Sequence, residues 1–209
     1  MLLIERFIPY SGWGMILILA IYSAFLISKM KDPEKTAVWR RRSWTLFSIV
    51  FFTQLILGTS GFDKFLMNPE KLHFPIPALI VGGPIYRGHI SFMPILFLST
   101  IILSGPAWCS QLCYFGAIDN IVAAKGKPNR KSIPYRNVLK HTFLFFVVIV
   151  AILFRLFNVE LNLISAAAAL FGIAGFMIIL IVSTGLNKMY HCTVYCPVGT
   201  LIRYAKYIN

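Results

Sequence analysis

Long apolar segments alternate with short charged ones along this chain, and their lengths predict helices that cross a membrane. A helix needs about 20 apolar residues to cross the hydrocarbon core of a bilayer. Five stretches approach or reach that length. They are Gly12–Ser28, Trp44–Ser60, Ile90–Trp108, Val138–Phe157 and Leu163–Gly185. A sixth stretch, Ile76–Tyr86, is apolar but short, and it indicates either a re-entrant or interfacial segment or a loop at the lipid surface.

The composition favours a membrane protein. Hydrophobic residues make up 58% of the 209 residues and charged residues only 13%, whereas soluble domains carry about a quarter charged residues. The first apolar stretch has no small-residue cleavage site behind it, so we expect it to remain as a helix. The chain is therefore expected to be a single all-α transmembrane domain, residues 1–209.

Positive charge is distributed unevenly between the loops. The net charge is +13, from 20 basic and 7 acidic side chains. If the five stretches cross the membrane in turn, 15 of the Lys and Arg side chains lie on one side and 5 on the other. The positive-inside rule then places the amino terminus outside and the carboxyl terminus in the cytoplasm. This topology predicts a multi-pass protein of a bacterial or archaeal cytoplasmic membrane, and it explains the basic charge without nucleic-acid binding.

The four cysteines form two pairs with the same spacing, Cys109/Cys113 and Cys192/Cys196. Each Cys-x-x-x-Cys motif is followed by a glycine three residues later, then by a small and an aliphatic residue. Each motif also follows a stretch that runs from the outside to the inside, so the chain contains two pseudo-symmetric hairpin repeats. The repeats cover about residues 44–120 and 138–209, and the first helix, about residues 12–28, precedes them.

This arrangement predicts one iron–sulfur cluster shared by both repeats. Cysteines at positions i and i+4 lie on one face of an α-helix, about 6 Å apart along its axis. Two such helices bring together four thiolates, the ligand set of a [2Fe–2S] or a [4Fe–4S] cluster, of which we favour the second. Gly105 and Gly185 are expected to break the helices so that the thiols turn inward. The predicted ligands are Cys109, Cys113, Cys192 and Cys196.

The cysteines could also have simpler roles. A free cysteine often serves only as a small apolar residue, and four thiolates also bind structural zinc. Disulfides are disfavoured on a reducing cytoplasmic side. The Cys-x-x-Cys-His motif of attached haem does not occur in the sequence.

Few other side chains suggest chemistry. The four histidines are expected at the membrane interfaces, where no two of them are placed to bind a haem. They are His73, His89, His141 and His191. Of these, His191 precedes Cys192 and is a candidate for a hydrogen bond to the cluster or for a replacement ligand. Asp119 is expected to cap its helix or to pair with Lys125. No set of acid and base residues for catalysis is recognisable.

The motifs resemble those of the membrane ferredoxin family, whose members carry paired Cys-x-x-x-Cys-Pro motifs. The resemblance covers about residues 40–209 and rests on Pro69–Tyr86, Cys109–Ile118 and Cys192–Leu201. Members include the quinol-oxidising membrane subunit of the periplasmic nitrate reductase system and the membrane electron donor of nitrous oxide reductase. The resemblance implies electron transfer between the quinone pool, or a cytoplasmic donor, and a partner redox protein.

Two features depart from the family pattern. Tyr114 replaces the proline of the first motif, and the chain ends at Asn209, so we expect it to lack the soluble two-cluster ferredoxin domain of many members. The predicted function is a non-catalytic electron-transfer subunit of a membrane redox complex in the lipid bilayer. Its expected partners are redox subunits such as a ferredoxin, a flavoprotein or a cytochrome, and a quinone is a further candidate ligand. The alternatives are a metal-binding assembly factor or sensor, and a membrane anchor for a redox partner.

Overall fold

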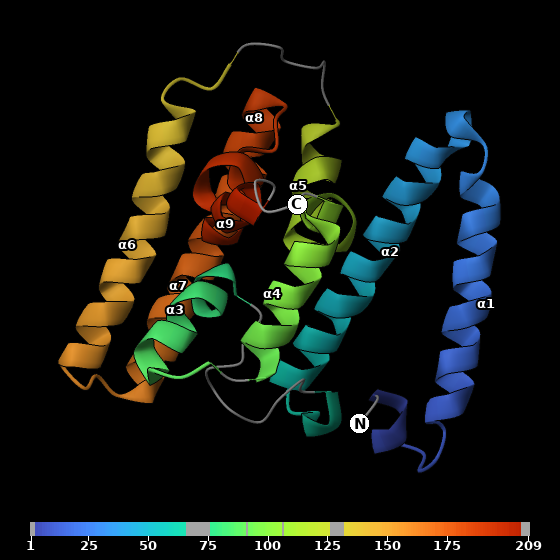
Figure 1. Cartoon of the computed structure of the whole chain (residues 1–209), viewed down its shortest axis with the longest axis horizontal. Coiled ribbons are helices and arrows are strands. Elements are labelled where there is room, and N and C mark those ends of the chain that lie inside the picture. The colour runs from blue at the N-terminus through green and yellow to red at the C-terminus, as the bar shows by residue number, and fades with distance from the viewer. Residues whose placement is uncertain (1–2, 66–75, 91, 106, 126–131, 206–209) are drawn as a thin grey trace. The chain divides into compact units, whose positions relative to one another are not determined.

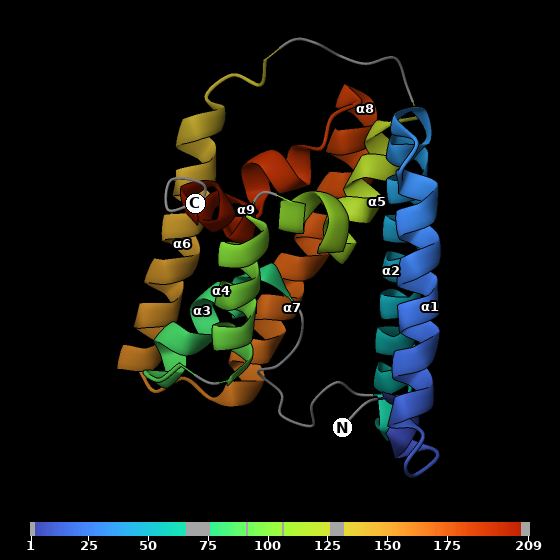
Figure 2. The ribbon, with the colours of Figure 1, turned by 45° about the vertical axis from the view of Figure 1, so that its right-hand side comes forward.

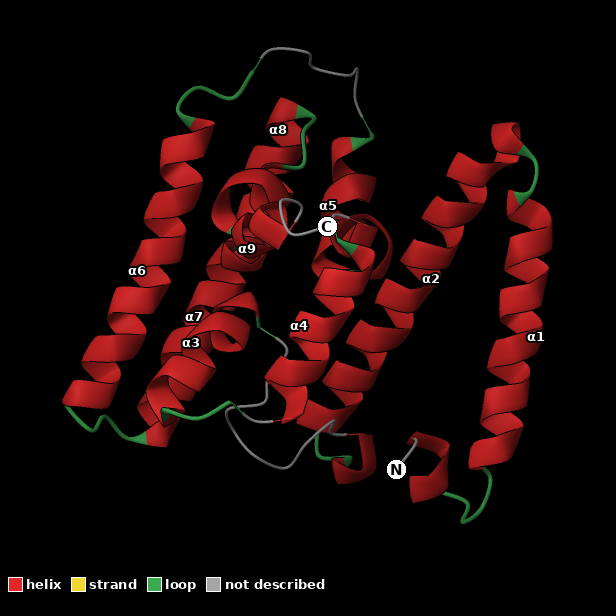
Figure 3. Ribbon diagram, viewed as in Figure 1, coloured by secondary structure: helices red, strands yellow, loops and turns green. Residues whose placement is uncertain are grey.

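Helices form all the regular structure in the part of the chain that the structure describes. The computed structural model describes residues 3–65, 76–90, 92–105, 107–125 and 132–205 (Figure 1). No strand occurs in these ranges (Figure 3). The prediction of an all-α protein is therefore confirmed. The chain divides into two compact units, Met1–Pro69 and Glu70–Asn209, which we call unit 1 and unit 2.

Unit 1 is a helical hairpin formed by α1 (Gly12–Met30) and α2 (Pro33–Thr59). Asp32 begins α2, because its carboxylate accepts a hydrogen bond from the N–H of Glu34 and Pro33 occupies the first helical position. Two short 3₁₀-helices, η1 (Leu3–Arg6) and η2 (Asp63–Phe65), lie at the open end of the hairpin. They are joined by a hydrogen bond of 3.1 Å from Arg6 to the carbonyl of Lys64.

Unit 2 contains the two cysteine motifs and a larger set of helices. Its α-helices are α3 (Pro77–Arg87), α4 (Phe92–Ser104), α5 (Tyr114–Ala123), α6 (Arg136–Leu156), α7 (Leu161–Ile178), α8 (Thr184–Leu186) and α9 (Pro197–Ala205). Three π-helical turns interrupt this series: η4 (Trp108–Leu112), η5 (Ile179–Ser183) and η6 (His191–Tyr195). The short apolar stretch Ile76–Tyr86 of the sequence thus forms the helix α3.

The core of unit 2 is built around α6, which contacts α3 toward one end and α9 toward the other (Figures 1 and 2). On one side of α3, Leu79 is buried with Ile164 and Ala168 of α7. A second buried cluster joins α4 to α9 and contains Ile101, Cys196, Val198 and Ile202. Cys196 of the second pair is thereby anchored in the apolar core.

Three helical segments are long and apolar enough to cross a membrane: Gly12–Met30, Arg136–Leu156 and Leu161–Leu186. They match three of the five predicted spans. The stretch Trp44–Ser60 forms the second part of α2 and its C-cap, and the first turns of this helix are strongly charged. The stretch Ile90–Trp108 yields only the 13 residues of α4, because Gly105 takes the left-handed conformation at φ 52° and ends the helix. Five membrane crossings and the division into two repeats stay predictions.

Candidate iron–sulfur site

Each cysteine motif forms a π-helical turn, and not the α-helix predicted from the spacing. The N–H of Cys113 donates to the carbonyl of Trp108 over 3.0 Å, and the N–H of Cys196 donates to that of His191 over 2.9 Å. Both bonds reach back five residues, as in a π-helix. The two second cysteines then leave the turn with almost identical dihedral angles, φ −71° and ψ 114° for Cys113 and φ −72° and ψ 116° for Cys196. The repeat seen in the sequence is thus also a repeat of backbone geometry.

Each second cysteine stands directly before a new helix. Cys113 precedes α5 and Cys196 precedes α9. Pro197 suits the first position of a helix because its N–H needs no partner there, and Tyr114 takes the same position in α5. The replacement of proline by tyrosine therefore leaves the local fold unchanged. The start of a helix also favours negative charge, which suits a thiolate.

A residue in the left-handed conformation precedes each cysteine motif, but the sequence predicts only the one before the first motif. Gly105 ends α4, as expected from the sequence. Gly185 lies inside α8, so the expectation that it breaks the helix is wrong. The break falls at Asn187, which has φ 50° and follows the last residue of α8. Asparagine is among the residues that tolerate this conformation best.

All four cysteines line one cavity in unit 2. Cys113 and Cys196 are buried, and Cys109 and Cys192 are partly buried. The remaining lining residues are mostly apolar or aromatic. They are Pro77, Ile80, Trp108, Tyr114, Phe115, His191, Val198 and Gly199. Among the described residues, no three His, Cys, Asp or Glu side chains group closely enough to hold a single metal ion.

The thiols of this cavity resist ionisation when no metal is bound. Burial raises the pKa of Cys109 to about 12, with a further contribution from the charge of Cys113. Burial likewise raises the pKa of Cys113 to about 11, although the N–H groups of Phe115 and Gly116 partly offset it. Burial first, and then Asp119 and the other cysteines, raise the pKa of Cys192 well above its ordinary value. Four thiolates in this cavity would therefore need a strongly positive partner, such as the iron of the predicted cluster.

Asp119 connects the two cysteine motifs, a role that the sequence analysis did not predict. Its carboxylate lies in α5, which follows the first motif, and accepts a hydrogen bond of 3.0 Å from the N–H of Cys192 in the second motif. The side chain is fully buried, so it neither caps the helix nor pairs with Lys125 as predicted. Burial raises the pKa of Asp119, and hydrogen bonds from Ser183 and the Cys192 N–H partly offset this.

Ser183 extends this connection. Its hydroxyl accepts a hydrogen bond of 3.1 Å from the N–H of Tyr190, and the side chain is fully buried. In the second repeat the position equivalent to Asp119 is Ile202, which is buried in the apolar cluster. The site is therefore pseudo-symmetric in its thiols and asymmetric in its surroundings. The one signal in the sequence was that Asp119 is acidic in an otherwise apolar segment of a chain with few acids.

His191 lines the same cavity. Its ring is only 2% exposed and stacks on Phe115 with centroids 5.5 Å apart, while Tyr195 packs on it at 5.4 Å. Neither ring nitrogen has a hydrogen-bond partner among the described residues. Burial lowers the pKa of His191 to about 4, although the backbone of Gly175 beside the ring partly offsets this, so the ring is neutral at physiological pH. A neutral imidazole that lines the same cavity as the thiols is consistent with the predicted hydrogen bond to a bound cluster.

The other histidines lie away from this cavity. His141 contacts the carbonyl of Asn137 and the hydroxyl of Tyr204. His89 is exposed, and His73 lies outside the described residues.

A close backbone contact requires the glycine of the second motif, Gly199. A Cβ atom at this position would lie 2.7 Å from the carbonyl oxygen of Cys192, which is closer than real Cβ contacts. Only glycine therefore allows the first turn of α9 to lie against the backbone of the first cysteine of its motif. The sequence showed the repeated glycine without showing this contact.

Comparison with known families agrees with the chemistry of the cavity. The family model described as a 4Fe-4S binding domain matches residues 87–132 and 168–208, which include both cysteine pairs. No curated protein and no solved structure matches the chain. The match supports an iron–sulfur binding protein and confirms the [4Fe–4S] cluster as the expected cofactor. The donor set fits this cofactor, because four soft thiols line one cavity from two sides.

Proposed function

We propose that this chain is an electron-transfer subunit of a membrane redox complex and that its four cysteines bind the [4Fe–4S] cluster. The observation that supports this most directly is the single cavity lined by both cysteine pairs. When bound, a cluster of this type accepts and releases single electrons. The resemblance to the membrane ferredoxin family supports the membrane ferredoxin subtype.

The residues of the chain have three tasks in this proposal. The cysteines hold the iron, the apolar residues of the cavity keep water away, and His191 donates a hydrogen bond to the bound cluster. The N–H groups of Val198 and Gly199 lie beside the sulfur of Cys196 and lower its pKa against the larger effect of burial. These groups stabilise negative charge at the site without adding a cation.

The proposed membrane arrangement has five spans, with the amino terminus outside and the carboxyl terminus in the cytoplasm. Three helices are long and apolar enough to cross, and the distribution of Lys and Arg supports the orientation. Both motifs then lie at the cytoplasmic ends of spans. One cluster near one face needs a donor and an acceptor, so the expected partners are a ferredoxin, a flavoprotein or a cytochrome.

A quinone is the proposed small-molecule donor. An apolar cavity of about 300 Å³ lies between α3, α6 and α7, a volume at the lower end of ligand pockets. The helix α3 separates it from the thiol cavity: Pro77 and Ile80 line the thiol cavity, whereas Leu79 and Gly82 line the apolar one. Phe171 of the apolar cavity stacks on Tyr195, which precedes Cys196. A ligand in this cavity would therefore lie one layer of side chains from the cysteines.

The proposal is tested by iron and acid-labile sulfide analysis of the anaerobically purified protein, with electron paramagnetic resonance. Single Ser substitutions at the four cysteines should each reduce the same signal, because serine removes a soft ligand with little change in volume. The Thr193→Ser variant is the matched control, since Thr193 is exposed within the second motif. A full, unaltered cluster in the double variant Cys109→Ser/Cys113→Ser would refute the shared site. A cluster that cannot be reduced reversibly would favour an assembly factor or sensor.

A further inference from the structure

Three cations gather where α6 begins and α9 ends. Arg136 is the first residue of α6, Lys140 lies one turn further on, and Arg203 lies in the last turn of α9. Both arginines are close enough to Lys140 to repel its ammonium group. Within the described part of the chain, no hydrogen bond or ion pair engages these three side chains.

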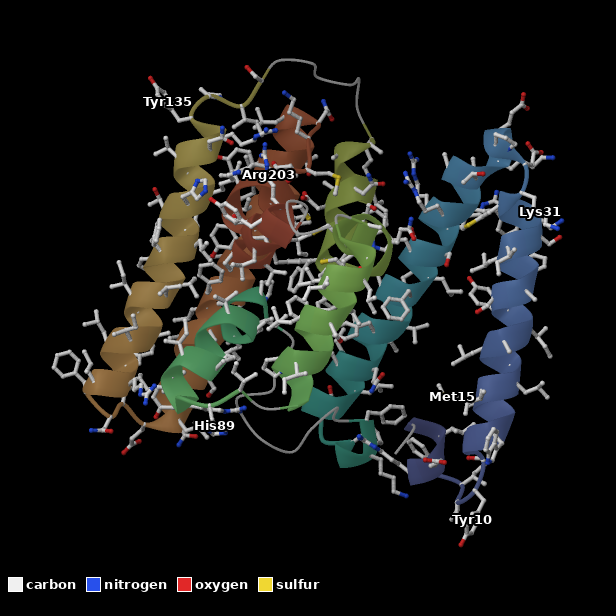
Figure 4. All side chains as sticks on the ribbon, in the orientation of Figure 1. Tyr10, Met15, Lys31, His89, Tyr135 and Arg203 are labelled. Atoms are coloured by element: carbon white, nitrogen blue, oxygen red, sulfur yellow. The ribbon has the colours of Figure 1, made fainter. Side chains whose placement is uncertain are left out.

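The packing of α6 against α9 holds these cations together. The hydroxyl of Thr200 in α9 donates to the carbonyl of Lys140 over 3.4 Å, and Tyr204 contacts His141 one residue further along α6. Lys140 is thereby only 7% exposed, although it lies near the end of the helices. Arg203 lies at the same end of unit 2 as Tyr135, opposite His89 (Figure 4).

This arrangement lacks a negative charge. The stem of Lys140 is buried, whereas its ammonium group reaches the surface. There the like charges of Arg203 and Arg136 repel it. The acidic side chains described in unit 2 are elsewhere: Asp119 binds the Cys192 N–H, and Glu160 precedes α7 at the opposite end of α6. An anion from outside the chain would relieve the repulsion.

The position of these three cations indicates which kind of anion they bind. The cations lie at the polar end of Arg136–Leu156, a helix that is long and apolar enough to cross a membrane. Phosphate headgroups occupy this depth, helix N-termini attract phosphate, and basic pockets between transmembrane helices on the cytoplasmic side bind anionic headgroups. We propose that Arg136, Lys140 and Arg203 bind the phosphate group of an anionic phospholipid in the seam between α6 and α9.

Lipid binding by the purified full-length protein tests this site. Native mass spectrometry and thermal unfolding are measured with phosphatidylglycerol, phosphatidylcholine and inorganic phosphate at one fixed salt concentration. Phosphatidylglycerol should bind more tightly than phosphatidylcholine. Arg203→Gln and Arg136→Gln should each weaken its binding by about fivefold, the usual effect of one basic residue at a membrane surface. Both arginines are exposed, so these variants are expected to fold.

Lys125→Gln is the matched control, because Lys125 is an exposed cation just after α5 and outside the cluster. Equal weakening by Lys125→Gln would show only general surface charge and would overturn the site. Equal binding of the two lipids would overturn it as well. Binding of inorganic phosphate without phosphatidylglycerol would assign the cations to a soluble anion and overturn the lipid assignment.

The Lys140→Met variant gives a second, independent readout. Without anionic lipid it should unfold at a higher temperature than the wild type, because the repulsion between Lys140 and the two arginines is removed. With phosphatidylglycerol the order should reverse, because the wild type gains a contact that the variant lacks. If Lys140→Met lowers the unfolding temperature equally in both conditions, Lys140 has only a packing role and the proposal fails.

Discussion

Replacement of Gly199 by alanine tests the geometry of the second cysteine motif most sharply. The new Cβ would lie 2.7 Å from the carbonyl oxygen of Cys192, whereas an ordinary contact begins at 3.4 Å. The neighbour is backbone inside a π-helical turn and cannot rotate away, and the Cβ of Cys196 lies 3.8 Å from the same position. The chain must therefore open by about 0.7 Å, and overpacking of this kind costs about 1–3 kcal/mol.

The opening displaces Cys192 itself, so Gly199→Ala should lose more than stability. We expect a lower unfolding temperature, less iron per chain and an altered electron paramagnetic resonance spectrum. Gly83→Ala is the matched control, because Gly83 lies inside α3 with no atom within 4 Å of the added Cβ. Alanine there should be neutral or stabilising by up to about 1 kcal/mol, from its higher helix propensity. If Gly199→Ala matches Gly83→Ala in iron content, spectrum and unfolding temperature, the close approach does not constrain the site.

Three further predictions follow from the surroundings of the thiols and from the topology. Asp119→Ala leaves the buried N–H of Cys192 without an acceptor and should lower the free energy of unfolding by about 1–3 kcal/mol. Asp119→Asn keeps an acceptor and should lose clearly less in thermal unfolding; equal losses would contradict the role of this hydrogen bond. After iron is removed by a chelator, Cys109 should be alkylated slowly at pH 8 and faster as the pH rises. The reason is that a pKa of about 12 in place of 9.0 reduces the fraction of thiolate about a thousandfold. Mass spectrometry measures the rate of alkylation, and rapid alkylation at pH 8 would contradict the burial of the thiol. Reporter fusions after Lys35 and Asn209 should both read as cytoplasmic, and a periplasmic reading at Asn209 would reverse the orientation.

The apolar pattern of the sequence was sufficient to predict the all-α class and the helices α1, α6 and α7. A long run without charges needs no tertiary information, because length and hydropathy alone decide whether a helix can cross a bilayer. The repeat of the cysteine motifs likewise predicted that both pairs belong to one site, and the structure places all four thiols around one cavity. That these thiols bind the cluster is still a prediction.

The details of the site depend on physics that spacing does not show. A π-helical turn differs from an α-helical turn only in which carbonyl accepts each hydrogen bond, so Cys-x-x-x-Cys is compatible with both. The bond between Asp119 and Cys192 joins residues 73 positions apart and exists only through tertiary packing. Gly185 was the plausible helix breaker by residue type, yet the left-handed conformation fell to Asn187. Glycine adopts the left-handed conformation more readily than asparagine does, but the packing of the chain places this conformation at Asn187.

The distance along the chain between the two halves of the cavity also determines when the cavity can form during biosynthesis. Its first wall, including Asp119, leaves the ribosome long before Cys192, which lies 73 residues later. Until residues 192–196 have been synthesised and have folded, the first pair of thiols has no opposite wall. A ribosome that stalls between the two motifs therefore leaves a chain with only one of the two cysteine pairs, which is half of the predicted ligand set.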